Sequence, residues 1–168
     1  VYVIGTMNTA DRSVEALDSA LRRRFSFIDT VPRPELLSRG EYAMTEVDLG
    51  ALLSAINRRI ERLLDRDHRI GHSYFMGISS ANDPLASLRE AFRDRVIPLL
   101  REYFYSDPAK VGLVLGDKFV KLANDAFAFA SFDPDMAERY LDKNEYQVTE
   151  PLEWTAEAFE SIYAVAED

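Results

Sequence analysis

The chain has 168 residues, 47% of them hydrophobic and 29% charged, which are proportions typical of a globular protein. No apolar run reaches the roughly 18–20 residues that a membrane span needs, so no membrane contact is expected. The lack of cysteine excludes disulfides and thiolate metal sites, and it fits the cytoplasmic location that we expect.

The net charge of −9 is unevenly distributed along the chain. Residues 125–168 carry twelve acidic side chains against two basic ones. This segment would repel a phosphate backbone, which argues against direct binding of nucleic acid here. The acidic residues form either a solvated face or a docking face for a basic partner.

The first 29 residues have the pattern of a strand, a polar loop, a helix and a second strand. Residues 1–6 are apolar on both faces like a buried strand, and residues 25–29 alternate like another. Residues 14–22 between them have helical spacing. This crossover predicts the edge of a parallel sheet. Because the chain begins at Val1 inside a strand pattern, we expect a fragment whose upstream part is missing.

The next part of the chain is helical in character. Apolar residues recur at helical intervals from Leu49 to Leu64, just after a capping-box spacing at residues 45–48. Asp83 and Asp107 each precede a proline, and this pair of residues is typical of a helix start. Pro98 is expected to kink or divide the helix that follows Asp83.

The end of the chain gives weaker signals. Residues 119–122 fit a strand or a packed helix, and short strands are expected around 127–132. Residues 154–166 have the pattern of a terminal amphipathic helix, whose buried side consists of Phe159, Ile162 and Tyr163.

Two polar features in the first 29 residues suggest chemistry on a phosphate. Asn8 follows the tip of the first predicted strand, which is where open α/β sheets place ligands. Its carboxamide can orient a water and donate to a phosphate oxygen without adding charge. Arg22, Arg23 and Arg24 end the predicted helix. An arginine there can reach a neighbouring subunit and neutralise charge on a transferring phosphoryl group.

These segments carry a resemblance to a known family. Residues 5–13 (Gly-Thr-Met-Asn-Thr-Ala-Asp-Arg-Ser) resemble the sensor-1 segment of AAA+ ATPases in its McrB-like form, and residues 17–25 resemble the arginine-finger helix. Residues 70–75 and 97–104 are similar to lid segments of McrB-like proteins, the GTP-hydrolysing motors of methylcytosine-dependent restriction systems. The resemblance covers residues 1 to about 116.

The resemblance implies an α/β plus α-helical fold. Residues 1–40 would be the C-terminal edge of an AAA+ P-loop NTPase core, and residues 41–124 a mostly helical lid domain. Residues 125–168 would be an acidic C-terminal extension.

The family motif also assigns roles to single residues. Asn8 matches sensor 1, which positions the attacking water, although a cap of the next helix is the plainer alternative. Asp11 and Arg12 match the branch signature, and they would orient that water or bridge to the next subunit; Asp11 could instead cap a helix. Arg23 and Arg24 are the candidates for the trans-acting finger, although the pattern does not choose among the three arginines. A solvated helix end is their alternative.

For the other polar residues, structural or solvated roles are weighed beside functional ones. His72 lies over the nucleotide or only fixes the lid geometry, and His68 is expected at the surface. With these two histidines and no cysteine, we expect no metal site of protein ligands. A stripe of arginines is expected to be solvated or paired with nearby acids, with a contact to a neighbouring subunit as the alternative: Arg58, Arg59, Arg62 and Arg66.

The sequence contains no Gly-x-x-x-x-Gly-Lys-Ser/Thr loop and no strand ending in paired acidic residues. In the family both lie upstream, so the main motifs for GTP or ATP with Mg²⁺ are expected outside this chain, which we predict to be inactive alone. The resemblance further implies a hexameric ring, a McrC-like nuclease subunit and DNA bound by other regions. The alternatives are a MoxR-like protein-remodelling ATPase and a non-hydrolysing helical interaction module.

Overall fold

A computed structural model describes the chain over residues 1–7, 23–39, 43–44, 46–123, 130–131, 135–136 and 145–164. Its helices are α2 (Leu49–Leu63), α3 (Pro84–Ala91), α4 (Ile97–Tyr103), α5 (Pro108–Leu115) and α7 (Ala156–Tyr163). Its strands are β1 (Val120–Leu122) and β2 (Tyr146–Val148). The predicted helix at 14–22 and most of the predicted strand region at 127–132 lie outside the described residues.

Helix α2 confirms the prediction from apolar spacing. Its N-cap is Asp48, whose carboxylate accepts from the backbone N–H groups of Gly50 at 2.9 Å and Ala51 at 3.0 Å. These bonds satisfy two donors that the first turn leaves without a helical partner. One face of α2 is buried in the core, through Leu49, Leu52, Leu53, Ile56, Asn57 and Ile60.

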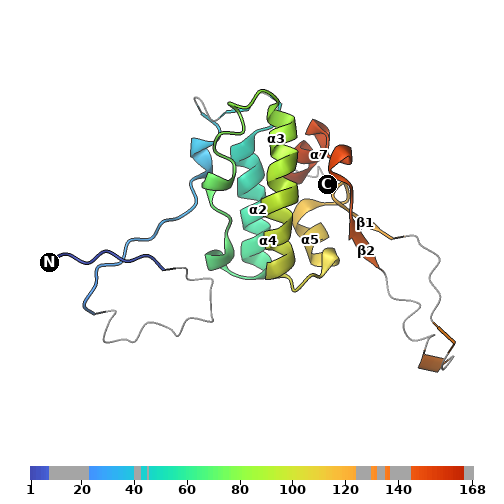
Figure 1. The fold of residues 1–168 in the computed structure, drawn as a ribbon, viewed down its shortest axis with the longest axis horizontal. Coiled ribbons are helices and arrows are strands. Elements are labelled where there is room, and N and C mark those ends of the chain that lie inside the picture. The colour runs from blue at the N-terminus through green and yellow to red at the C-terminus, as the bar shows by residue number, and fades with distance from the viewer. Residues whose placement is uncertain are drawn as a thin grey trace.

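The second helical stretch starts and divides as the sequence predicts. Asp83 caps α3 by accepting from the Ala86 N–H at 2.9 Å. A π-helical turn at Phe92–Val96 then separates α3 from α4. Because Pro98 has no N–H and its ring crowds the carbonyl one turn back, the backbone must widen before it. Figure 1 shows that α3 and α4 nevertheless run on in one direction beside α2.

A short helix and a hairpin complete the fold. Asp107 caps α5, and Gly116 ends it with a φ of 94°, a conformation that favours glycine. Strand β1 pairs antiparallel with β2, with Val120 opposite Val148 and Leu122 opposite Tyr146. In Figure 1 the two strands lead away from the helices.

The core joins the last part of the chain to the helices before it. Phe92, at the start of the π-helical turn, contacts three rings that follow α5: Phe119 at 5.7 Å, Trp154 at 6.5 Å and Phe159 at 4.9 Å between centroids. The predicted terminal helix is confirmed over Ala156–Tyr163, with Phe159 and Ile162 buried. Trp154 lies before this helix and donates from its indole N–H to the Thr149 hydroxyl at 2.9 Å.

The predicted strands at 1–6 and 25–29 are wrong for the described residues. Residues 1–7 and 23–31 form no strand, and their side chains are exposed. A strand is stable only when its backbone N–H and C=O groups pair with another strand, and none of the described residues offers one to these runs. The described residues therefore do not show the expected edge of an α/β core. Among the described residues, no helix has the length and apolar character needed to cross a bilayer.

Candidate functional site

The predicted finger residues lie at the surface. Arg23 and Arg24 are exposed in a turn and precede an extended, exposed run up to residue 31. Asn8, Asp11 and Arg12 lie outside the described residues, so their roles remain predictions.

The segment that follows the arginines is attached to the helical body. Asp29 accepts from Arg66 at 3.2 Å, and the backbone N–H of Arg33 donates to the Nδ1 of His72 at 3.2 Å. Leu37 is fully buried in the core. The run from 29 to 38, called the linker below, thus joins the arginine turn to the helices.

The linker meets α2 at very close range. The Ser38 hydroxyl donates to the Asp48 carboxylate at 2.8 Å. A Cβ at position 50 would collide with the Ser38 hydroxyl and lie 2.7 Å from the Pro34 carbonyl oxygen, so only glycine fits there. The Asp48 N–H donates to the Tyr163 hydroxyl at 3.1 Å, which brings the end of α7 to the same point.

The charge of Asp48 is stabilised at this junction. Partial burial acts to raise the pKa of its carboxyl, but hydrogen bonds from the Ala51 N–H, the Ser38 hydroxyl and the Gly50 N–H hold the pKa below its ordinary value. Asp48 therefore stays ionised while it holds the linker and α2 together.

His72 lies half-buried in the short helix His72–Tyr74. Its Nδ1 accepts the Arg33 N–H, so the ring must leave this nitrogen unprotonated. This bond fixes the linker against the helical body, which is a structural role for His72. A contact of His72 with nucleotide stays a prediction. The Arg95 guanidinium lies 5.9 Å from the centre of the neighbouring Tyr74 ring.

The sequence analysis expected His68 at the surface, but the residue is partly buried, with a side chain only 16% exposed. Its Nδ1 lies 2.7 Å from the Asp65 carboxylate, and its ring meets the Tyr103 ring edge-on at 4.9 Å. The hydrogen bond to His68 lowers the pKa of Asp65. The i, i+3 spacing of Asp65 and His68 in the sequence is the signal that could have indicated this pair.

Asn57 is a structural residue that sequence reasoning missed. It is buried on the core face of α2, where its amide donates to the Ile70 carbonyl at 2.9 Å and accepts from the Ile70 N–H at 2.7 Å. A polar residue between the core positions Ile56 and Ile60 was the available signal. The two bonds fix the loop that leads to His72.

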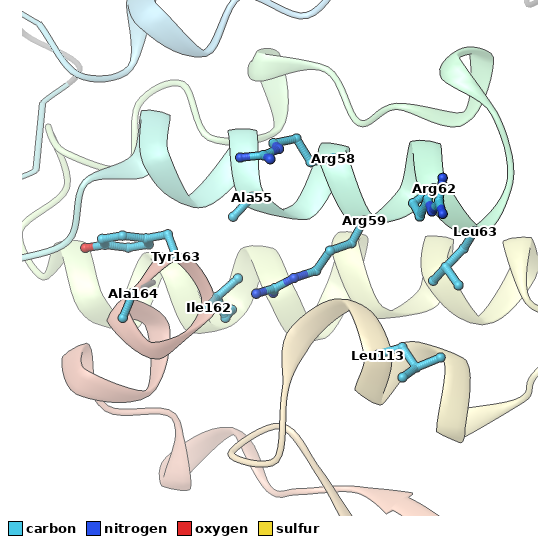
Figure 2. Close-up of a pocket in the computed structure, with 9 residues that line it drawn as sticks. All are labelled: Ala55, Arg58, Arg59, Arg62, Leu63, Leu113, Ile162, Tyr163 and Ala164. Carbon is cyan, nitrogen blue, oxygen red and sulfur yellow. The ribbon is translucent and has the colours of Figure 1, made fainter. Parts of the chain in front are cut away.

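The arginines of α2 line a groove. The groove has a volume of about 640 Å³ and lies between α2, α5 and α7, as Figure 2 shows. We call it the arginine groove; it is lined by Ala55, Arg58, Arg59, Arg62, Leu63, Leu113, Ile162, Tyr163 and Ala164. Of the predicted arginine stripe, Arg66 instead pairs with Asp29 in the linker.

The described residues hold no group of three or more His, Cys, Asp or Glu side chains that could bind a metal ion. This finding covers only the described ranges, and the Mg²⁺ that the family resemblance implies would be held by motifs outside this chain.

The helical body resembles part of a known family of proteins. Residues 48–112 match the family described as McrB, alpha-helical lid domain. Over 122 residues, or 66% of its length, the chain is 41% identical to the Type IV methyl-directed restriction enzyme EcoKMcrB subunit of Escherichia coli (strain K12). The match covers 27% of that subunit, so the chain spans about a quarter of its relative. The chain is therefore an McrB-like protein, and its residues 48–112 form an McrB alpha-helical lid domain.

Proposed function

We propose that this chain is the C-terminal part of an AAA+ motor that hydrolyses GTP or ATP with Mg²⁺. The motor would drive DNA translocation for a McrBC-like, modification-dependent restriction endonuclease. The observation that carries the proposal is an McrB lid attached through a bonded linker to an exposed arginine turn. The 41% identity to a restriction enzyme subunit supports it, and favours it over a MoxR-like ATPase.

In this proposal the chain supplies two parts of a composite site. Asn8, with Asp11 and Arg12, acts on the nucleotide of its own subunit, and Arg23 or Arg24 acts on that of a neighbour. Such a division requires self-association, which we propose to be a hexameric ring joined by a McrC-like nuclease subunit. The exposure of Arg23 and Arg24 supports the trans role, because a finger must reach out of its own subunit.

The test removes the finger from the full-length protein. Arg23→Ala with Arg24→Ala should lower kcat by about 10³-fold or more, the usual effect of losing such an arginine. Nucleotide affinity should change by less than about threefold, because the finger acts only on the developing charge. Arg101→Ala removes another exposed arginine, from α4, and is the matched control, with kcat unchanged.

Two results would contradict the proposal. An equal loss of nucleotide binding and turnover in the double variant would assign the arginines to the bound nucleotide of their own subunit. Rapid hydrolysis by the 168-residue chain alone would show that the phosphate site is not upstream.

A mixing experiment gives the complementary test. Subunits with an inactivated phosphate loop but intact Arg23 and Arg24 should restore turnover when they are mixed with the double variant.

A further inference from the structure

The arginine groove contains cationic groups that the described part of the chain does not neutralise. Arg59 reaches from α2 towards α5, where its Nη1 donates to the Val114 carbonyl at 2.6 Å (Figure 2). Burial lowers the pKa of this guanidinium, which remains charged. No carboxylate of the described residues forms an ion pair with Arg58, Arg59 or Arg62. A partly buried charge without a counter-charge is costly, so the groove is suited to an anionic ligand.

The walls of the groove are apolar. Leu113 on α5 is 63% exposed, and Leu63 at the end of α2 is also open to solvent. Ile162 and Tyr163 close the side formed by α7 (Figure 2). An inorganic anion would leave these walls wet. A ligand that fits both features carries several carboxylates and large apolar side chains together, as an acidic peptide segment does.

This chain itself contains a segment of that composition. Residues 125–145 carry six acidic side chains against two basic ones, together with four aromatic rings: Phe127, Phe129, Phe132 and Tyr140. The segment is joined to β1 and β2, and both strands pack against α5, which forms one wall of the groove. The proposed self-association would bring this segment of one copy to the groove of another.

We propose that the arginine groove binds the acidic, aromatic segment 125–145 of a second copy of this chain. The inference rests on the proposed self-association and names a contact that would contribute to it. Carboxylates of the segment would pair with Arg58 and Arg62, one helical turn apart on the exposed side of α2, and its rings would cover Leu63 and Leu113.

A nucleic acid strand fits the groove less well than this segment. Glu61 is exposed on α2 between Arg58 and Arg62 in the sequence, and Glu160 acts electrostatically on Tyr163 at the other side. The chain as a whole carries a net charge of −9. Neither carboxylate lines the groove, so a uniform polyanion would meet them where it extends beyond the arginines, whereas a peptide presents carboxylates only at intervals.

The first experiment measures binding of a fluorescent peptide of residues 125–145 to the 168-residue chain by anisotropy. Arg58→Glu with Arg62→Glu should weaken binding at least about tenfold, the effect of losing one good charge pair. Arg58→Gln with Arg62→Gln should weaken it in the same direction, and it guards against misfolding of the reversal variant. Arg101→Glu on α4 is the matched control, and this variant should bind the peptide as tightly as the unaltered chain does. The chain that carries Arg23→Ala and Arg24→Ala should also bind the peptide with unchanged affinity.

The second experiment exchanges the charges between two copies. Self-association, measured by sedimentation, should weaken in the Arg58→Glu, Arg62→Glu chain and in an Asp133→Lys, Asp142→Lys chain. A mixture of the two should recover it, because each supplies the complement that the other has lost.

Three outcomes would overturn the inference: no binding of the peptide, equal binding of a peptide whose six carboxylates are replaced by amides, or tighter binding of a single-stranded oligonucleotide that the same arginine variants abolish. The last outcome would assign the groove to nucleic acid. A loss of turnover in the Arg23 and Arg24 variant with peptide binding intact separates this inference from the proposed hydrolytic role.

Discussion

At the scale of single residues, Asn57 holds in place the loop that leads to His72. Both backbone polar groups of Ile70 bond to its amide, and Ile70 is buried. No water can replace the amide there at low cost, since the surroundings are core residues of α2 and the loop.

We predict that Asn57→Ala lowers the free energy of unfolding of the chain by about 3 kcal/mol, since it leaves a buried N–H and a buried C=O without partners. Urea unfolding measures the change. Ser54→Ala, on the same helix and half-buried, should stay within about 0.5 kcal/mol. A cost of Asn57→Ala as small as that of Ser54→Ala would show that the Ile70 bonds contribute little.

Asp48 should give the junction of linker and α2 a dependence on pH. Its folded pKa lies below the ordinary value, so its contribution to stability is complete above the unfolded pKa of about 4 and is lost as the pH falls through the folded pKa. Asp48→Asn keeps an N-cap acceptor but cannot titrate. The stability difference between the chain and this variant should therefore shrink between about pH 5 and pH 2, as measured by denaturation at a series of pH values. A constant difference would contradict the assignment.

The partners and burial of single side chains were harder to predict than the roles that their chemistry allows. The sequence indicated a structural role for His72 as one alternative, but nothing near it in the chain indicated its partner, because Arg33 lies 39 positions earlier. The partial burial of His68 was also missed. Its local partner Asp65 was visible in the spacing, but the Tyr103 ring that covers it comes from another helix.

At the scale of elements, α7 is held by aromatic packing. Phe159 is fully buried between Phe92 and Phe119, with ring centroids 4.9 Å and 5.3 Å away. Phe159→Ala should cost about 3–5 kcal/mol, from lost transfer free energy and the cavity that remains. Leu152→Ala, at a site 86% exposed, is the control and should be nearly neutral. Chemical denaturation of both variants gives the comparison. A small cost for Phe159→Ala would mean that α7 packs loosely.

The elements that the sequence predicted correctly are those with local causes. Asp48, Asp83 and Asp107 each cap the helix that follows from within its own first turn, and Pro98 acts through the turn before it. The strands expected at 1–6 and 25–29 failed because a strand depends on a partner, which the described residues do not provide. Likewise, β1 forms because β2 supplies its hydrogen bonds, with Val120 paired to Val148, 28 positions further along the chain.

At the scale of the whole molecule, the structure bears on how the chain is divided. The proposed division into residues 1–40, 41–124 and 125–168 treats the last part as an extension of the lid. Residues 145–164 nevertheless share one core with α2, the π-helical turn and α5. The Arg89 guanidinium also donates to the Trp154 carbonyl at 2.7 Å, which links α3 to this part of the chain. Within the described residues, the lid and residues 145–164 thus form one packed unit.

One unit should unfold in one step, and the single tryptophan of the chain, Trp154, reports on it. Trp154 is buried beside Phe92 and Phe119, whereas far-UV circular dichroism follows mainly the helices. We predict that the two signals have the same midpoint in urea, and that Phe159→Ala lowers both midpoints together. If residues 145–164 were an independent extension, the fluorescence change would precede the loss of helix, and Phe159→Ala would move only the fluorescence midpoint. Coincident transitions would instead show that an McrB-type lid in this chain requires residues 145–164 to complete its core.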